Sequence, residues 1–277
     1  MKIVLAPDSF KESMSAAQAI AAMREGVQSA LPDAVCVGVP MADGGEGTVD
    51  AVVDALGGEH VTVEVADALG RPAPACYGFV ASRGLAVIEM AAASGLELIP
   101  PHERDVLRAS TFGVGALIAD ALDRGAGEFI IGLGGSATND GGAGMLAALG
   151  ATLTDAAGAA LAPGGAALAD LHRIDLDGLD PRLATARIQL ACDVTAPLLG
   201  PGGASAIFGP QKGATPADVA VLESALATFA RVAQASQAET PGAGAAGGLG
   251  FALLEFLGAT ARPGVEVVAE TLSLIHI

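Results

Sequence analysis

Two acidic residues stand within a glycine-rich stretch, Asp43-Gly44-Gly45-Glu46-Gly47-Thr48. The two carboxylates lie three residues apart on a backbone that glycine leaves conformationally free. That arrangement suits Mg²⁺, which binds proteins through one or two carboxylates together with water and phosphate oxygens. The same residues would also suit the start of a helix, where acidic side chains stabilise the first turn. This stretch alone leaves both interpretations open.

A second stretch, from Gly134 to Gly142, reads Gly-Gly-Ser-Ala-Thr-Asn-Asp-Gly-Gly and separates a predicted strand from a predicted helix. Its backbone amides could cradle a phosphate, while Ser136 and Thr138 donate hydrogen bonds. The alternative is a tight turn that ends in a helix N-cap. Such a run of small and polar residues is longer than a turn needs, which favours a binding loop.

Lysine is scarce, since the chain contains only Lys2, Lys11 and Lys212. Lys11 and Lys212 lie in predicted polar loops. Exposed lysines are usually solvated charges, but an acidic protein that binds an anion needs local cations. Asp193 follows a predicted strand over 188–191. At that place it could orient a hydroxyl, bind a metal or simply form a turn.

Familiar nucleotide and nucleophile motifs are incomplete or misplaced. Residues 242–247 match GxGxxG, but they follow a predicted helix rather than a strand. Residues 134–138 lack the final glycine of a nucleophile elbow. The sequence contains no GxxxxGK[ST], so if the protein uses ATP it is not a Walker-type kinase.

The overall composition narrows the classes of protein. Lys and Arg number 14 against 31 Asp and Glu, and the formal net charge of −17 argues against nucleic acid or an anionic membrane as partner. Hydrophobic residues make up 52% of the chain and exclude disorder. No apolar run reaches the ~18 residues that cross a bilayer. The 3 cysteines and 4 histidines are dispersed, which predicts neither a disulfide framework nor a zinc site and favours a cytoplasmic protein.

The hydrophobic pattern predicts alternating strands and helices. Strands over 3–7 and 35–39 flank a helix that begins after Ser15, and another helix follows over 49–56. This order is typical of a parallel sheet, in which ligands gather beyond the carboxyl ends of the strands. Residues 60–90 alternate in polarity and predict a small antiparallel piece. Further helices are predicted over 111–124 and 215–234, and further strands over 128–133 and 188–191.

Six stretches of the sequence carry a resemblance to a known family. They are Ala6–Ser13, Pro40–Thr48, Gly134–Gly142, Cys192–Thr195, Phe208–Pro216 and Pro241–Gly250. In content and order they resemble the bacterial glycerate kinase family, the type without a P-loop. The resemblance implies two α/β domains with the active site in the cleft between them. We therefore expect a Rossmann- or flavodoxin-like parallel-sheet domain of residues 1–65 and about 260–277, interrupted by a mixed-sheet α/β domain of residues 66–259.

The resemblance also implies an activity, the ATP-dependent phosphorylation of D-glycerate to 2-phosphoglycerate with Mg²⁺ as cofactor. It implies that Asp43 and Glu46 bind the metal, that Asp193 meets the substrate hydroxyl and that Lys212 holds the glycerate carboxylate. The partners would be small molecules, with a homodimer as the expected assembly if the chain associates. The expected catalytic residues are Asp193, Lys11 and Asp43, the substrate-binding residues Asp8, Ser9, Ser136, Thr138, Asn139, Asp140 and Lys212, and the nucleotide-binding residues Gly134, Gly135 and Gly141.

The sequence departs from the family at its C-terminal end. Family members continue beyond the stretch that matches residues 263–272, whereas this sequence ends in Ser273-Leu274-Ile275-His276-Ile277. We therefore expect a chain truncated at its C-terminus. The alternatives to a 2-phosphoglycerate-forming kinase are a kinase that forms 3-phosphoglycerate or acts on another small hydroxy acid, an anion-binding fragment without turnover, and a scaffold whose glycine loops are structural.

Overall fold

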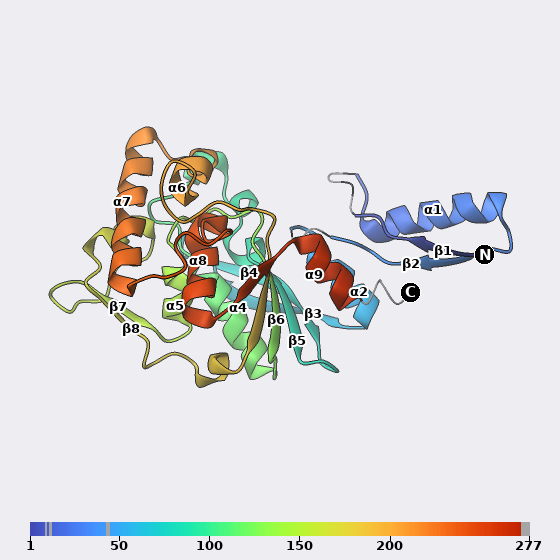
Figure 1. Ribbon diagram of the computed structural model, residues 1–277, viewed down its shortest axis with the longest axis horizontal. Helices are drawn as coiled ribbons and strands as arrows, with labels where there is room; N and C mark the ends of the chain where they lie inside the picture. The colour runs from blue at the N-terminus through green and yellow to red at the C-terminus, as the bar shows by residue number, and fades with distance from the viewer. Residues whose placement is uncertain (9, 11–12, 43–44, 273–277) are drawn as a thin grey trace.

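The computed structural model describes residues 1–8, 10, 13–42 and 45–272 (Figure 1). Three predicted site residues, Ser9, Lys11 and Asp43, lie outside the described residues, as do the last five residues of the sequence, 273–277. The rest of the chain forms helices packed on β-sheets, so the expected α/β class is confirmed. No helix within the described ranges is both long enough and apolar enough to span a membrane.

A mixed six-stranded sheet forms the centre of the described chain, in the order β10-β9-β6-β5-β4-β3. The first four of these strands run parallel, whereas β3 pairs antiparallel with β4 and β4 with β5, as the alternating pattern predicted. The strands are β3 (Glu59–Ala66), β4 (Pro72–Val80), β5 (Leu85–Glu89), β6 (Glu128–Gly132), β9 (Arg187–Ala191) and β10 (Thr260–Arg262).

Both faces of this sheet are buried. Side chains alternate across the strands, so Ile88 and Ile131 belong to one hydrophobic cluster while Val87 and Ile130 belong to the other. One cluster packs under α4 (Phe112–Asp123), α5 (Ala143–Ala148), α7 (Pro216–Ala233) and α8 (Ala245–Leu257), and the other under α2 (Thr48–Leu56) and α9 (Gly264–Thr271). The helices therefore form a layer on each side of the sheet, as Figure 1 shows.

The first part of the chain forms a separate unit, made of β1 (Lys2–Leu5), α1 (Ala16–Ala30) and β2 (Val35–Gly38). Its two strands pair in parallel with each other, and the unit projects from the larger body in Figure 1. The predicted capping box is present, because the Ser15 side chain accepts from Gln18 N–H and the Gln18 side chain accepts from Ser15 N–H.

The domain boundary expected between residues 65 and 66 does not coincide with a boundary between sheets. Strand β3 pairs with β4 from Glu59 to Ala66, so these residues lie in the six-stranded sheet. Strand β10 also lies in that sheet rather than beside β1 and β2. The reason is physical: Val61 and Val65 of β3 are buried in the same hydrophobic cluster as Ala75 and Tyr77 of β4. The division into an interrupted and an inserted domain stays a prediction.

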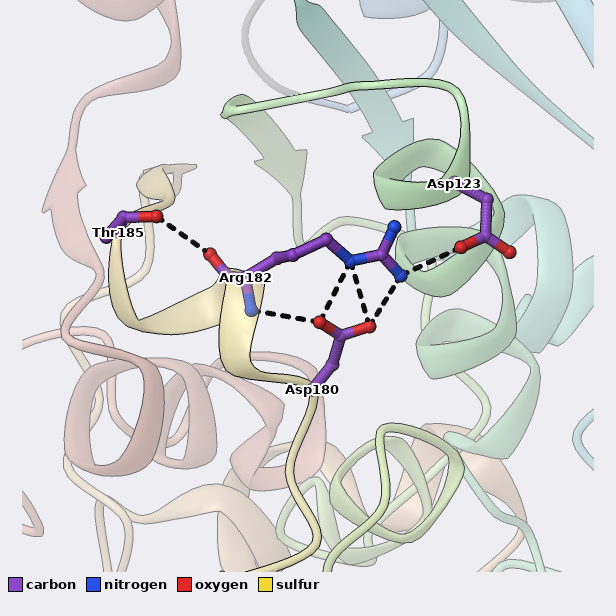
Figure 2. Close-up of polar contacts among 4 residues, drawn as sticks. All are labelled: Asp123, Asp180, Arg182 and Thr185. Carbon is purple, nitrogen blue, oxygen red and sulfur yellow. Dashed lines mark hydrogen bonds and ion pairs between the residues drawn. The ribbon is translucent and has the colours of Figure 1, made fainter.

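Short elements complete the larger body. A surface ion cluster fixes one of them, because Arg182 in η4 binds Asp180 and also reaches Asp123 at the end of α4, with Nη2–Oδ distances of 2.6 and 2.8 Å (Figure 2). The hydrogen bonds from Arg182 lower the pKa of Asp180. The short elements are α3 (Ala91–Ser94), η1 (Leu96–Leu98), η2 (Pro101–Glu103), β7 (Thr152–Thr154), η3 (Gly165–Asp170), β8 (Arg173–Asp175), η4 (Pro181–Ala184), α6 (Ala204–Phe208) and η5 (Pro210–Lys212).

Some of the few aromatic residues join one helix to another or a helix to the sheet. Phe229 of α7 contacts Phe251 and Phe256 of α8, with ring centroids 5.6 and 5.8 Å away. Tyr77 of β4 is fully buried, and its hydroxyl donates to Asp120 Oδ2 of α4 at 2.7 Å. Burial and this hydrogen bond raise the pKa of the Tyr77 phenol. These contacts fix the helix layer on the face of the sheet that they cover.

Candidate active site

A cavity of about 500 Å³ opens where the parallel strands β5, β6 and β9 end. This is the place at which ligands bind in parallel α/β sheets, because loops from several strands converge there. Its wall combines carboxylates with glycines and small apolar side chains. The lining residues are Gly45, Glu46, Glu89, Ala91, Ala92, Gly95, Glu97, Leu98, Gly132, Leu133, Gly134, Gly135, Ala191, Cys192, Asp193, Val194 and Ala245.

Asp193 lies in this wall two residues beyond the end of β9, as its place after a predicted strand indicated. Its Oδ1 accepts the backbone N–H of Gly264 at 3.1 Å. Gly264 is the first residue of α9, a helix that has no side-chain cap of its own. Asp193 is exposed and lines the cavity, so its carboxylate stabilises the start of α9 and remains accessible to a ligand.

Glu89 ends β5 and lines the same cavity, although the sequence analysis did not single it out. Its Oε1 accepts the backbone N–H of Val49 in the first turn of α2 at 3.0 Å. Burial raises the pKa of Glu89, while the hydrogen bond from Val49 N–H lowers it and the nearby charge of Asp50 raises it further. A glutamate that ends an otherwise apolar strand, Leu-Ala-Val-Ile-Glu, was the available signal.

The glycines at the end of β6 bring two loops together. A Cβ on Gly134 would lie 3.3 Å from Cα of Gly45, so this glycine allows the second loop to approach closely. Gly135 has φ of +72°, and a Cβ there would lie 3.2 Å from Cβ of Ala91. Gly135 O also accepts the Leu96 N–H at 2.8 Å. The two glycine-rich stretches of the sequence therefore meet at the cavity, as their common place at strand ends indicated.

The remainder of the loop over 134–142 turns into the protein. Thr138, Asn139 and Asp140 are fully buried. The Asp140 carboxylate accepts hydrogen bonds from Thr111 N–H at 2.8 Å and from Thr111 Oγ1 at 2.9 Å, and from the N–H groups of Gly142 and Gly144, each at 3.1 Å. Burial raises the pKa of Asp140, and these hydrogen bonds oppose the shift. Asp140 thus holds the loop in shape.

Lys212 is buried in the same network, with 1% of its surface exposed. Its Nζ donates to the backbone oxygen of Thr138 at 2.6 Å. Burial lowers the pKa of Lys212 to about 7, and the charge of Asp140 opposes this shift. None of Ser136, Thr138, Asn139, Asp140, Gly141 and Lys212 is among the residues that line the cavity. Direct contact of these residues with substrate or nucleotide therefore stays a prediction, which the lining of the cavity does not support.

A second cavity, of about 420 Å³, lies between the β1–α1–β2 unit and α2. Asp8 and Glu46 both line it, and Glu46 also lines the first cavity. The structure thus brings Asp8 near the site through the loop that carries Glu46. The lining residues are Asp8, Phe10, Ser13, Met14, Ser15, Ala16, Ala17, Gln18, Pro40, Met41, Glu46, Gly47, Asp50, Ala51, Asp54 and His60.

The charge of the first cavity is negative in the part of the chain that the structure describes. Glu46, Glu89, Glu97 and Asp193 contribute carboxylates to its lining, and no lysine or arginine is among them. Hard oxygen donors of this kind fit Mg²⁺, which needs one or two carboxylates when phosphate oxygens and water supply the rest. Among the described residues, no group of three or more His, Cys, Asp and Glu is arranged to hold a metal ion without such help.

The fold and the cavity define an α/β protein with an acidic, glycine-lined ligand site at the carboxyl ends of parallel strands. Residues 3–276 match the sequence profile of the Glycerate kinase family. The chain belongs to this family, and the expectation that it is an enzyme of the kinase class is confirmed.

Individual relatives agree with this assignment. Glycerate kinase of Bacillus subtilis (strain 168) is 50% identical over 100% of this chain and 74% of its own length. Glycerate 2-kinase of Escherichia coli (strain K12) is 51% identical over 99% of this chain and 73% of its own. A crystal structure assigned as glycerate kinase 2 from Salmonella typhimurium LT2 matches with a TM-score of 0.96 at 51% identity, over 99% of this chain and 74% of that one. Coverage of nearly the whole chain does not by itself support the truncation expected at its C-terminus.

Proposed function

We propose that this protein transfers the γ-phosphoryl group of ATP to the 2-hydroxyl of D-glycerate, with Mg²⁺ as cofactor, and releases 2-phosphoglycerate and ADP. Family membership supports glycerate phosphorylation, and a relative named glycerate 2-kinase supports the position of transfer. One observation carries the proposal. Glu46, Asp193 and the glycines Gly134 and Gly135 come from three separate chain segments and line one cavity.

Each group has a proposed role in that cavity. Gly134 and Gly135 present backbone without side chains, which lets phosphate oxygens approach closely. Glu46, together with Asp43 of the same loop, would hold Mg²⁺, which when bound neutralises phosphate charge. Asp193 accepts the proton of the substrate hydroxyl, since its carboxylate is exposed at the strand end. Phosphoryl transfer depends mainly on such positioning and charge neutralisation.

The other predicted residues have supporting places in this proposal. Asp8 lines the adjoining cavity with Glu46 and would contact the glycerate side of the site. Thr138, Asp140 and Lys212 keep the glycine loop in its conformation through buried hydrogen bonds. Lys11 and Ser9 are proposed as phosphate and substrate contacts on the strength of the family resemblance alone.

The test is ADP release from ATP and Mg²⁺ that depends on D-glycerate, followed by identification of the product. Enolase consumes 2-phosphoglycerate directly, whereas 3-phosphoglycerate reaches enolase only after added phosphoglycerate mutase. We expect an enolase signal without the mutase. A signal that requires the mutase would favour the 3-phosphoglycerate alternative, and turnover with other small hydroxy acids but not glycerate would overturn the substrate.

The same preparation separates the non-enzymatic alternatives. Ligand-induced thermal stabilisation without turnover would select an anion-binding protein, because binding alone stabilises the native state. If the folded chain shows no stabilisation by ligands and no turnover, the scaffold alternative is favoured. Sedimentation velocity on the same sample tests the homodimer, which stays a prediction along with the cytoplasmic location.

A further inference from the structure

The start of α2 depends on a side chain from another element. Its N-cap residue is Gly47, with φ of +90°, and no side chain of its own caps the helix. The first four N–H groups of a helix have no partner within the helix. Glu89 supplies one from the end of β5, since its Oε1 accepts the Val49 N–H at 3.0 Å across 40 positions of sequence.

The turn before α2 carries the carboxylate proposed for Mg²⁺. Thr48 Oγ1 donates to Gly45 O at 2.8 Å, so this turn is closed onto the first residue of the helix. Gly45 in turn lies against Gly134, where an added Cβ would come within 3.3 Å of its Cα. Glu46 stands between these two contacts and lines the cavity.

The hydrogen bond of Glu89 therefore acts on the site through the helix end. If α2 shifts, Glu46 shifts with it relative to Gly134, because the 45–48 turn moves with the first turn of the helix. Helix α2 is packed on β4 and β5 by Val49, Val52 and Val53, whose side chains lie in the smaller hydrophobic cluster. Apolar packing of this kind is non-directional, whereas the hydrogen bond from Val49 N–H to Glu89 Oε1 is directional and ties the first turn of α2 to the end of β5.

We infer that Glu89 is a positioning residue for the proposed reaction: it sets the place of Glu46, and hence the Mg²⁺ requirement, by holding the first turn of α2. This inference rests on the proposed function. It assigns to Glu89 no contact with substrate and no proton transfer. What matters is an acceptor for the N–H groups at the start of α2, chiefly that of Val49 at Oε1 and in lesser degree those of Thr48 and Gly47. A glutamine keeps the oxygen at the Oε1 position and should preserve the main contact.

Three variants test the inference. E89A removes the hydrogen-bond acceptor. E89D keeps the carboxylate, but its side chain is shorter by one methylene group. E89Q keeps the side-chain length and an acceptor oxygen but removes the charge. The control is T215A, which removes the capping side chain of α7, where Thr215 Oγ1 accepts from Asp218 N–H at 3.2 Å. T215A measures what the loss of a helix cap does when the helix carries no proposed site residue.

We expect E89A and E89D to raise the half-saturating Mg²⁺ concentration about tenfold or more and to lower kcat, as changes behind a metal ligand do. E89Q should stay within about threefold of the parent enzyme, and T215A should lower Tm without changing the Mg²⁺ requirement. Loss of activity in E89Q equal to that in E89A would overturn the inference in favour of a direct catalytic contact. Unchanged kinetics in E89A and E89D would reduce Glu89 to a stabilising cap and overturn it too.

A readout independent of turnover keeps the two proposals separable. Amide hydrogen exchange over residues 45–52 should be faster in E89A and E89D than in the parent protein and E89Q. If E89A does not fold, the pair of E89D and E89Q carries the same comparison. Absence of glycerate-dependent ADP release from the parent enzyme would remove the proposed function. Equal exchange in all variants would remove the inference about Glu89.

Discussion

Glu89 and Asp193 occupy equivalent places in the structure but differ in burial. Each follows or ends a parallel strand, each lines the cavity, and each accepts a backbone N–H from the first turn of a helix on the same face of the sheet. Glu89 is partly buried and burial raises its pKa, whereas Asp193 is exposed. The same device thus yields one carboxylate that is committed to its helix and another that can also meet a ligand.

The same distinction applies to the glycine loop. We call residues that line the cavity facing residues, and residues that keep the backbone in place by buried hydrogen bonds holding residues. Gly134 and Gly135 line the cavity, while Asp140 and Lys212 are buried outside its lining, where Asp140 accepts from Thr111 N–H and Lys212 donates to Thr138 O. Substitution of a facing residue should change kinetics with little change in stability. Substitution of a holding residue should change stability first, and its effect on kinetics should be indirect.

The largest effect is expected for the facing carboxylate. D193N keeps an oxygen that can accept the Gly264 N–H, so the fold should be preserved. It removes the proton acceptor, and we expect kcat to fall roughly 10²- to 10⁴-fold, the usual contribution of a general base. Steady-state kinetics beside a thermal melt measure both quantities. A D193N enzyme with kcat within a few-fold of the parent would break the comparison, because both carboxylates would then only hold helices.

The holding role of Lys212 can be tested through the pH dependence of the free energy of unfolding. Its pKa is about 7 in the native state against 10.5 as its ordinary value, so between these pH values the unfolded chain binds the extra proton. The burial cost is then fully present below about pH 7 and is relieved as pH rises toward 10.5. The free energy of unfolding should therefore rise with pH across this window.

Substitution by Lys212→Met removes that pH dependence. We expect the difference in unfolding free energy between the parent protein and K212M to shift in favour of the parent by on the order of 3 to 4 kcal/mol from pH 7 to pH 10. Denaturant unfolding at several pH values measures it. Because K212M also leaves the Thr138 oxygen without this donor, only the pH-dependent part is diagnostic. A pH-independent difference would mean that the pKa of Lys212 is the same in the native and the unfolded protein, and would contradict the shift that burial imposes.

A smaller effect is expected at Gly135, which has φ of +72°. Alanine there adds backbone strain of about 1–2 kcal/mol and places a methyl group at the cavity wall. G135A should raise the KM for ATP several-fold while Tm falls modestly. G158A is the matched control, since Gly158 also has a positive φ, of +81°, a Cβ there would meet nothing within 4 Å, and the residue lines neither cavity. Equal kinetics in the two variants would show that Gly135 serves the turn rather than the ligand.

Local features of the fold were predictable from the sequence to a large extent. The capping boxes at Ser15 and Thr215 are local patterns of polar residues and set the starts of α1 and α7 where expected. Asp193 was predictable because a strand end in a parallel sheet places it at the ligand edge. The antiparallel character of β3 was predictable too, but its place in the six-stranded sheet was not, because an alternating strand does not say which sheet it joins.

The site was predictable in its loops and less so in its residues. A run such as Ser136 to Asp140 looks equally suited to binding a phosphate and to capping nearby backbone, because both tasks use the same donors and acceptors. In the structure the Asp140 carboxylate accepts from Thr111, the N-cap of α4, and from Gly144 in the first turn of α5, so it makes the backbone contacts of a cap, while its contact with substrate stays a prediction. Glu89 escaped notice because its role depends on Val49, a contact made only by the tertiary fold.

The buried hydroxyl of Tyr77 gives the molecule an optical reporter of its own. The chain has 1 Tyr and no Trp, so absorption near 280 nm and tyrosine emission come from a single ring in the joint between β4 and α4. Since Asp120 and burial keep that phenol protonated to higher pH than in water, the ultraviolet band of tyrosinate at alkaline pH reports when this joint opens. Unfolding of the larger body can therefore be followed without any added label.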